Sequence, residues 1–227
     1  MTGSWYLVLP LMVLITGSLQ AAPVDSKVYE FVETVLVGTE YGPFEPVVSR
    51  WTRSPELSLF DASDDQEQAV LEMVYELNEI LKPAGTQLKI GKPLDENAVF
   101  KIYFANRKQF PEIAARHHFE YVPGNAGFFY FWWNPGHEIH RAVVMIDKKL
   151  KGKQLRHYVH EEITQALGPA NDSPIFSDSI FFEKGRNTGK ATRFNELDRK
   201  LIFFLYKHVR PGYGREKIRE TFEKHWE

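Results

Sequence analysis

Apolar residues recur every three or four positions in several stretches of the chain, which is the spacing of helices that bury one face. Together with cap and stop residues, this pattern predicts helices over residues 27–37, 66–81, 110–117, 153–167, 194–208 and 215–226. Alternating patterns and short apolar runs predict strands over residues 56–60, 87–90, 99–104, 127–133 and 140–146.

The order of these elements predicts the class of fold. A helix and a strand come first, then a second helix, several strands and finally two helices, which is typical of an α+β domain with a helix laid across one sheet. Turn residues separate the elements, as at Pro83–Gly85, at Asn134–Gly136 and at Gly168 with Pro169. The 227 residues suit one domain, and no internal repeat is evident.

The first 22 residues have the pattern of a secretory signal peptide. No charged side chain precedes Asp25, an apolar run covers residues 5–15, and small residues follow up to Ala22. The run is shorter than the roughly 20 residues of a membrane-spanning helix. We therefore expect export to the periplasm or the medium, cleavage after Ala21 or Ala22, no stable membrane span, and a single domain over residues 23–227. The alternative is an uncleaved interfacial anchor.

Charge and cysteine content exclude several classes of protein. The chain has 28 Lys and Arg against 30 Asp and Glu, a net charge of −2, so it lacks the basic excess of a nucleic-acid-binding protein. It has no cysteine, which excludes disulfides, thiolate zinc fingers, iron–sulfur clusters and a cysteine nucleophile.

The helix expected over residues 153–167 carries the candidate chemistry. On a helical wheel, four apolar residues form its core stripe: Leu155, Val159, Ile163 and Ala166. Glu162 lies within that stripe, Gln165 lies beside it, and Glu161 comes next. A carboxylate among apolar residues is costly unless it is paired, hydrogen-bonded or protonated. Glu162 is therefore a candidate catalytic group, with a structural ion pair as the alternative.

The segment Glu161-Glu162-x-x-Gln165-x-x-Gly168-x-x-Asn171-Asp172 resembles the metzincin signature His-Glu-x-x-His-x-x-Gly-x-x-His. The resemblance implies a zincin-like fold, with a mixed twisted sheet, an active-site helix and C-terminal helices. It implies that Glu162 is the general base and that Glu161, Gln165 and Asn171 occupy the metal-ligand positions.

Two further segments extend this resemblance. Ser179-Ile180-Phe181 looks like a Met-turn in which Phe replaces Met, and residues 197–206 are similar to the helix that closes metzincin domains. The resemblance therefore implies that Asp172, Ser179 and Phe181 border the cleft. The chain from residue 23 onward more closely resembles a domain-of-unknown-function family of exported bacterial proteins with the same Glu-Glu-x-x-Gln-x-x-Gly segment and Asn-Asp pair.

The ligand positions lack the three histidines of the metzincin signature. One carboxylate and two amide oxygens would take their place. Amide oxygens are weak zinc ligands and suit Ca²⁺, Mg²⁺ or Mn²⁺ better. Three hypotheses remain. The protein is a metal-dependent hydrolase of peptide or cell-wall bonds, with a peptide or envelope protein as its partner. Alternatively, it is a metal-free pseudoenzyme whose polar residues form a hydrogen-bonded network and whose cleft only binds. In the third, the pattern is a coincidence.

The histidines offer weaker candidates. His157 lies about 40° from Glu161 on the wheel and is placed to share an ion with it, although a solvated position is favoured. His160 falls on the outer polar face. The pairs His117-His118 and His137-x-x-His140 are expected at the surface or in turns.

Residues 128–133 are six consecutive aromatics. Because neighbouring side chains on a strand point to opposite faces, some of them must leave the main core. They line either an aromatic subsite or a second face covered by a helix or loop, and the usual packing of aromatics favours the second interpretation.

Overall fold

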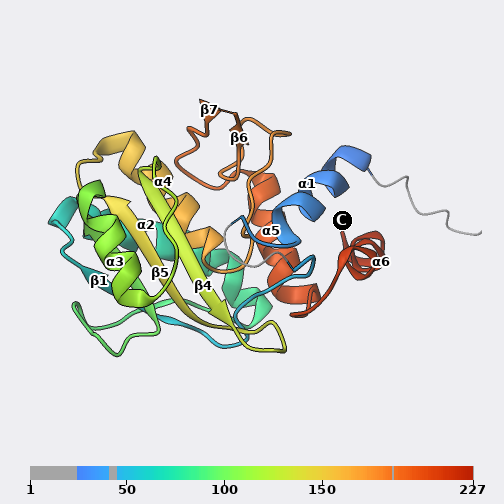
Figure 1. The fold of residues 1–227 in the computed structure, drawn as a ribbon. Helices are drawn as coiled ribbons and strands as arrows, with labels where there is room; N and C mark the ends of the chain where they lie inside the picture. The colour runs from blue at the N-terminus through green and yellow to red at the C-terminus, as the bar shows by residue number, and fades with distance from the viewer. Residues whose placement is uncertain (1–24, 41–44, 186, 227) are drawn as a thin grey trace, which may run out of the picture.

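The computed structural model describes residues 25–40, 45–185 and 187–226 (Figure 1). The expected signal peptide lies outside the described residues, so it stays a prediction. Five strands form one mixed sheet in the order β2 (Lys89–Ile90), β1 (Glu56–Phe60), β3 (Phe100–Ala105), β5 (Ile139–Asp147) and β4 (Gly127–Trp133). Neighbouring strands are parallel except β4, which runs antiparallel to β5 at the edge.

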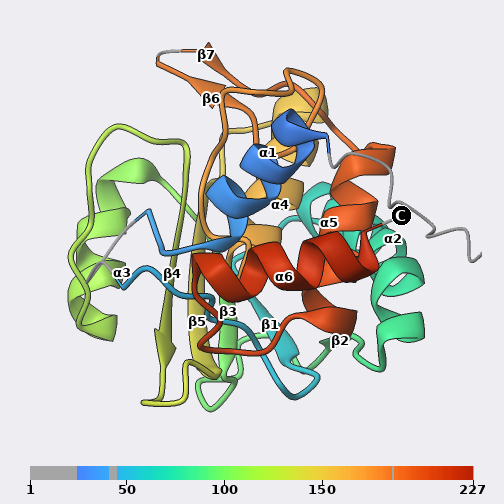
Figure 2. The same ribbon diagram turned by 90° about the vertical axis from the view of Figure 1, so that its right-hand side faces the viewer.

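Helices cover both faces of this sheet (Figures 1 and 2). The larger core lies on the face that carries α2 (Asp64–Leu81) and α4 (Gly152–Gln165), with α5 (Glu196–His208) against α2. Farther out, α1 (Ser26–Leu36) packs against α6 (Arg215–His225). The opposite face carries α3 (Phe110–His117). The predicted α+β class, the mixed sheet, the central helix and the C-terminal helices are confirmed.

The predicted helices and strands agree with the observed ones to within one or two residues. Local chemistry explains this agreement, because helix starts are marked in the sequence. In α2, for example, Ser63 and Gln66 form a reciprocal capping box. The sequence did not predict the short hairpin of β6 (Glu183–Lys184) and β7 (Asn187–Thr188).

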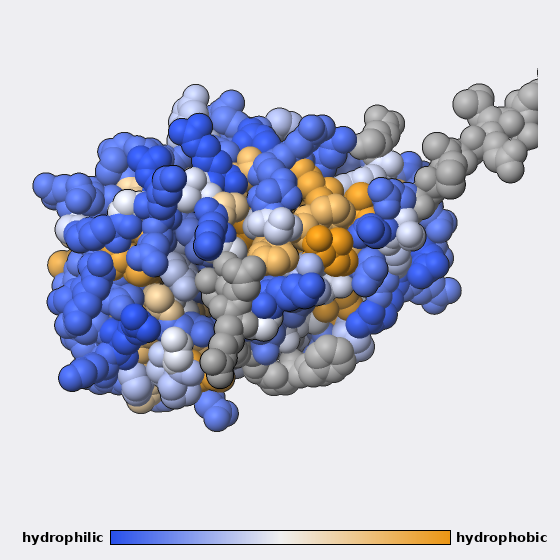
Figure 3. Space-filling model, turned by 90° about the horizontal axis from the view of Figure 1, so that it is seen from above, coloured by the Kyte–Doolittle hydropathy of each residue, from blue (hydrophilic) through white to orange (hydrophobic). Residues whose placement is uncertain are grey.

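The surface seen in Figure 3 is mostly hydrophilic, with hydrophobic residues gathered in a central zone. Over the described part of the chain, no helix combines the length and the apolar character needed to cross a bilayer.

The aromatic strand β4 divides its side chains between two cores. Phe129 and Phe131 enter the larger core, whereas Phe128 faces the smaller core beneath α3. Phe119, just after α3, stacks on Phe128 and Tyr130 with ring centroids 5.9 and 4.9 Å apart. A helix and the loop that follows it therefore cover the second face, which confirms the favoured interpretation.

His117 was expected at the surface, and this expectation is wrong because the ring packs between two strands and is buried. A guanidinium nitrogen of Arg141 lies 2.7 Å from His117 Nδ1, and the Tyr103 hydroxyl lies 2.9 Å from Nε2. A guanidinium only donates, so Nδ1 accepts and the ring is neutral. Burial, followed by the nearby positive charge of Arg141, lowers the pKa of His117 to about 4.

We expect His117 to contribute less to the stability of the fold as the pH falls from 6.5 to about 4. Unfolded His117 gains a proton near pH 6.5, the ordinary pKa of a histidine, whereas the folded residue resists protonation until about pH 4. The free energy of unfolding of the wild type, measured relative to that of His117→Gln, should therefore fall by up to about 3 kcal/mol across this window. Urea unfolding between pH 4 and pH 8 measures the effect.

The matched variants are His117→Gln, which should flatten this pH dependence, and His140→Gln, which changes an exposed histidine and should leave it intact. An equally steep pH dependence in His117→Gln would contradict the assignment.

Candidate functional site

A cavity of about 30 Å³ lies where α4 meets the start of β4. Five carboxylate side chains line it: Glu40, Glu161, Glu162, Asp172 and Glu183. The other lining residues are Asn125, Gly127, Phe128, Tyr158 and Gln165, so no lysine or arginine is among the described residues around it. We call this cavity the carboxylate pocket.

Helix α4 and strand β4 fix Glu162 between them. Only 6% of Glu162 is exposed, and a Cβ atom at Gly127 would lie 2.2 Å from Glu162 Oε1 and 2.6 Å from its Cγ. The absence of a side chain at Gly127 therefore gives Glu162 the space for its carboxyl group. Glu161, which is also 6% exposed, lines the same pocket.

The bend after α4 brings Asp172 back to the helix. Gly168 has a φ of +130°, and a Cβ atom there would lie 2.5 Å from the Ser49 carbonyl oxygen, so both conformation and space favour glycine. Beyond the bend, Gln165 Nε2 donates a 2.8 Å hydrogen bond to Asp172 Oδ1. Glu183 lines the same pocket as Asp172 and helps to raise the pKa of the Asp172 carboxyl group.

Burial raises the pKa of both Glu161 and Glu162 well above the usual range of a glutamate. The nearby negative charges act in the same direction, above all Glu162 on Glu161 and Asp172 on Glu162. Burial, followed by the charge of Glu40, raises the pKa of Asp172 to about 8. The pocket therefore favours neutral carboxyl groups, or a positive charge among them.

Asn171 has a different environment from its neighbour Asp172. Its Nδ2 atom donates a 3.2 Å hydrogen bond to the Val37 carbonyl, and it lines an adjacent cavity of about 490 Å³. That cavity shares Glu40, Asp172 and Glu183 with the carboxylate pocket. Of the residues at the signature positions, the structure thus brings Glu161, Glu162, Gln165 and Asp172 together and places Asn171 beside the larger cavity.

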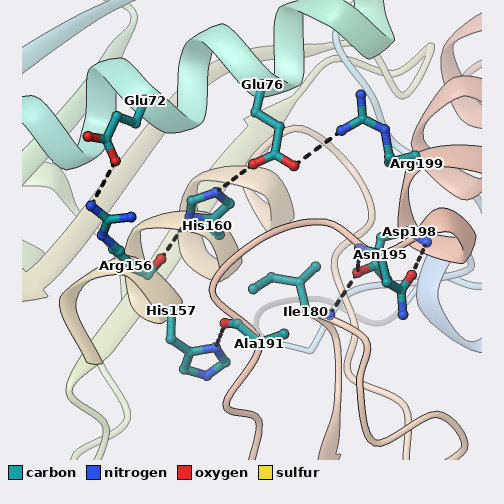
Figure 4. A network of polar contacts seen from close by, with 10 residues as sticks. All are labelled: Glu72, Glu76, Arg156, His157, His160, Ile180, Ala191, Asn195, Asp198 and Arg199. Carbon is teal, nitrogen blue, oxygen red and sulfur yellow. Dashed lines mark hydrogen bonds and ion pairs between the residues drawn. The ribbon is translucent and has the colours of Figure 1, made fainter. Parts of the chain in front are cut away.

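The Ser179–Phe181 turn lies in the core and does not line the carboxylate pocket. Ser179 Oγ donates to Asp198 Oδ1 at 2.6 Å, and the Ile180 N–H donates to Asp198 Oδ2 at 3.0 Å (Figure 4). Phe181 is fully buried against Phe31. These contacts attach the turn to the start of α5.

His157 and His160 are both buried, so the expectation that they are solvated is wrong. The segment before α5 covers His157, whose Nδ1 lies 2.9 Å from the Ala191 carbonyl oxygen (Figure 4). Helix α2 covers His160, whose Nε2 lies 3.3 Å from Glu76 Oε2. The helical wheel put His160 on the outer face, and the usual behaviour of a lone helix histidine favoured solvent for His157. Neither argument contains information about the covering segments.

The donor atoms of the pocket favour a hard cation. Carboxylate and amide oxygens suit Ca²⁺, Mg²⁺ or Mn²⁺. Behind the lining, 3.3 Å from Glu161 Oε2, lies a buried imidazole nitrogen, Nε2 of His157, that has no hydrogen-bond partner. The described residues contain no group of three or more His, Cys, Asp or Glu side chains already arranged around a metal position. Cation binding would therefore require the side chains to draw together, or amide and water ligands to complete the set.

Sequence reasoning missed Glu40 and Glu183 as members of the pocket. Glu40 follows α1, and Glu183 lies in the unpredicted β6–β7 hairpin. Neither residue belongs to a motif or stands at an unusual position in its element. Only the tertiary fold brings them to α4.

We expect Gly127→Ala to destabilise the fold by about 1–3 kcal/mol, because the new methyl group overlaps the Glu162 side chain. In a Glu162→Ala background the overlapping atoms are gone, so the same change should cost much less. Urea unfolding of the wild type, both single variants and the double variant gives the coupling between the two sites. Strictly additive costs would show that Gly127 and Glu162 do not constrain each other.

Comparisons with known proteins place the chain in a family. No curated protein matches it. Two solved structures, described as "Structure of myroilysin" and "Crystal structure of myroilysin", are similar to it, with TM-scores of 0.40 and 0.43 and identities of 11% and 12%. The first match covers 70% of this chain and 95% of the other, and the second covers 82% and 97%. A family model described as "Protein of unknown function (DUF2927)" matches residues 26–224. The chain therefore belongs to the DUF2927 family, as its resemblance to a domain-of-unknown-function family had led us to expect.

Proposed function

We propose that the protein is an exported hydrolase of peptide bonds and that the carboxylate pocket, holding a divalent cation, is its catalytic centre. The observation that carries this proposal is the convergence of five carboxylates on one small cavity with no basic residue in its described lining.

Electrostatics support a cation in this pocket. Ionised carboxylates repel one another strongly when they are buried together, and burial itself disfavours each charge. Protonation relieves part of this repulsion, and the raised pKa of Asp172 favours it there. A divalent cation relieves more of it and satisfies the remaining oxygen atoms. Glu161, Gln165 and Asp172 are the residues that would hold it, with Glu40 and Glu183 close by. Such a cation polarises a carbonyl group as a Lewis acid.

Glu162 is the proposed general base. Its carboxyl group lies against the backbone of the edge strand β4 at Gly127. A raised pKa brings a carboxyl group closer to neutral pH, where it both accepts and returns a proton efficiently. Glu162 would take a proton from the attacking water and return it to the leaving amine.

The larger cavity offers a route for substrate. It is about 490 Å³ in volume and lies next to the carboxylate pocket, with which it shares Glu40, Asp172 and Glu183. The choice of a peptide bond as substrate rests on the resemblance of the Glu161–Asp172 segment to the metzincin signature. Export rests on the pattern of the first 22 residues.

One observation favours a second function, that of an inactive binding module. The carboxylate pocket has only about 30 Å³ of space, and Gln165 already donates a hydrogen bond to Asp172 within it. A network of this kind is stable without a cation, and the larger cavity would then bind a partner in the cell envelope.

The test combines metal analysis with peptide digestion. The wild type is loaded with Zn²⁺, Ca²⁺ or Mn²⁺, bound metal is quantified, and a peptide library is digested and read by mass spectrometry. We expect one cation per chain and peptide cleavage. Glu162→Gln should keep its fold but lose at least about 100-fold in rate, because the general base is gone.

Glu79→Gln provides the control, because Glu79 pairs with Lys82 on exposed helix surface and should leave the rate unchanged. No bound cation and no cleavage in the wild type, with a more stable Glu162→Gln variant, would overturn the hydrolase and support the binding module.

A further inference from the structure

We propose that His157 is a ligand of the cation in the carboxylate pocket, binding through Nε2 beside Glu161, and that the site consequently prefers a transition metal such as Mn²⁺, Co²⁺ or Zn²⁺ to Ca²⁺. This inference rests on the proposed cation but not on peptide cleavage. It places one ligand a helical turn before the positions that correspond to the metzincin signature.

The hydrogen bond of the other ring nitrogen fixes the state of the His157 ring. Nδ1 lies 2.9 Å from the Ala191 carbonyl oxygen, which only accepts, so Nδ1 carries the proton. In the neutral ring, Nε2 then presents a lone pair. Only 4% of His157 is exposed, and Nε2 has no hydrogen-bond partner. A buried nitrogen lone pair without a donor is costly, so this atom is placed to bind a ligand.

Glu161 lies beside this lone pair. Its Oε2 atom is 3.3 Å from His157 Nε2, but the contact lacks the geometry of a hydrogen bond. Two ligand atoms about 2.0–2.1 Å from one tetrahedral metal ion are roughly 3.3–3.4 Å apart. The observed separation therefore suits two ligands of one ion. Their spacing of four residues places both on one face of α4.

The surroundings of His157 support a ligand role. Metal-binding histidines commonly donate their second ring N–H to a backbone carbonyl, which fixes the orientation of the ring, and Ala191 supplies this contact (Figure 4). Gly189 closes over the ring, since a Cβ atom there would lie only 2.9 Å from His157 Cε1. The loop thereby excludes water from the proposed ligand atom.

His160 shows the contrast on the same helix. Its Nδ1 lies 2.8 Å from the Arg156 carbonyl oxygen and its Nε2 bonds to Glu76, which also pairs with Arg199. Both ring nitrogens of His160 thus have acceptors within the protein. A nitrogen ligand such as Nε2 of His157 shifts the preference of an otherwise oxygen-lined site toward transition metals.

The experiment compares the full chain with two single variants, His157→Gln and the matched control His160→Gln. Each protein is titrated with Co²⁺, Mn²⁺, Zn²⁺ and Ca²⁺ by calorimetry, and the Co²⁺ absorption spectrum is recorded. We expect the wild type to bind Co²⁺ at least about 10-fold more tightly than Ca²⁺. His157→Gln should lose at least about 10-fold in Co²⁺ affinity and change the Co²⁺ spectrum, whereas His160→Gln should stay within about 3-fold of the wild type.

A second measurement uses only the wild type, so its result does not depend on whether His157→Gln folds. In histidine side-chain NMR, Zn²⁺ should shift the His157 ring resonances and leave those of His160 in place. Cation binding with unshifted His157 resonances and unchanged affinity in His157→Gln would overturn this inference and leave the hydrolase proposal standing. Cation binding through His157 without peptide cleavage would support this inference and overturn the hydrolase proposal. If the wild type binds no cation at all, both proposals fail.

Discussion

The burial of two adjacent glutamates on α4 is the constraint on which the rest of the site depends. Glu161 and Glu162 lie inside the domain, and their neighbours in the pocket add negative charge instead of compensating for it. Such an arrangement opposes folding unless protons or a cation neutralise it. The glycine at position 127 shows that the sheet is shaped to admit this carboxyl group and not to exclude it. The electrostatic cost is therefore built into the architecture.

The sheet supplies the rigidity that such a site needs. Parallel strands β1, β3 and β5 form its buried centre, and β4 closes one edge in the antiparallel direction. Aromatic side chains of β4 pack into cores on both faces. The position of the strand start at Gly127 relative to α4 is thus fixed by packing on two sides. Carboxyl groups held between such elements keep their separation despite their mutual repulsion.

Most of the fold was predictable from local sequence, whereas much of the site was not. Periodicity and caps located α2 and α4, and the spacing from Glu161 to Asp172 indicated the central acidic residues. The environment of His157 depends on Ala191, more than 30 residues away, and Glu40 comes from before the first strand of the sheet in sequence. Contacts of this range leave no local pattern, so a solvated position was favoured for His157 on the general behaviour of a lone helix histidine. The sequence also could not predict which residue of the Asn171–Asp172 pair contacts Gln165, because the backbone bend at Gly168 determines this.

The carboxylates of the pocket come from separate segments of the chain, so neutralising their charge affects several parts of the fold. Glu40 follows α1, Glu183 belongs to the β6–β7 hairpin, and the remaining carboxylates come from α4 and the bend after it. Whatever neutralises the pocket acts on three separate parts of the chain at once. A ligand that binds only the folded arrangement stabilises it by mass action, and here that stabilisation would hold the α1 end and the hairpin to the central helix. The mutual repulsion of the carboxylates opposes folding when nothing offsets it, whereas the same groups would stabilise the fold when they share a cation.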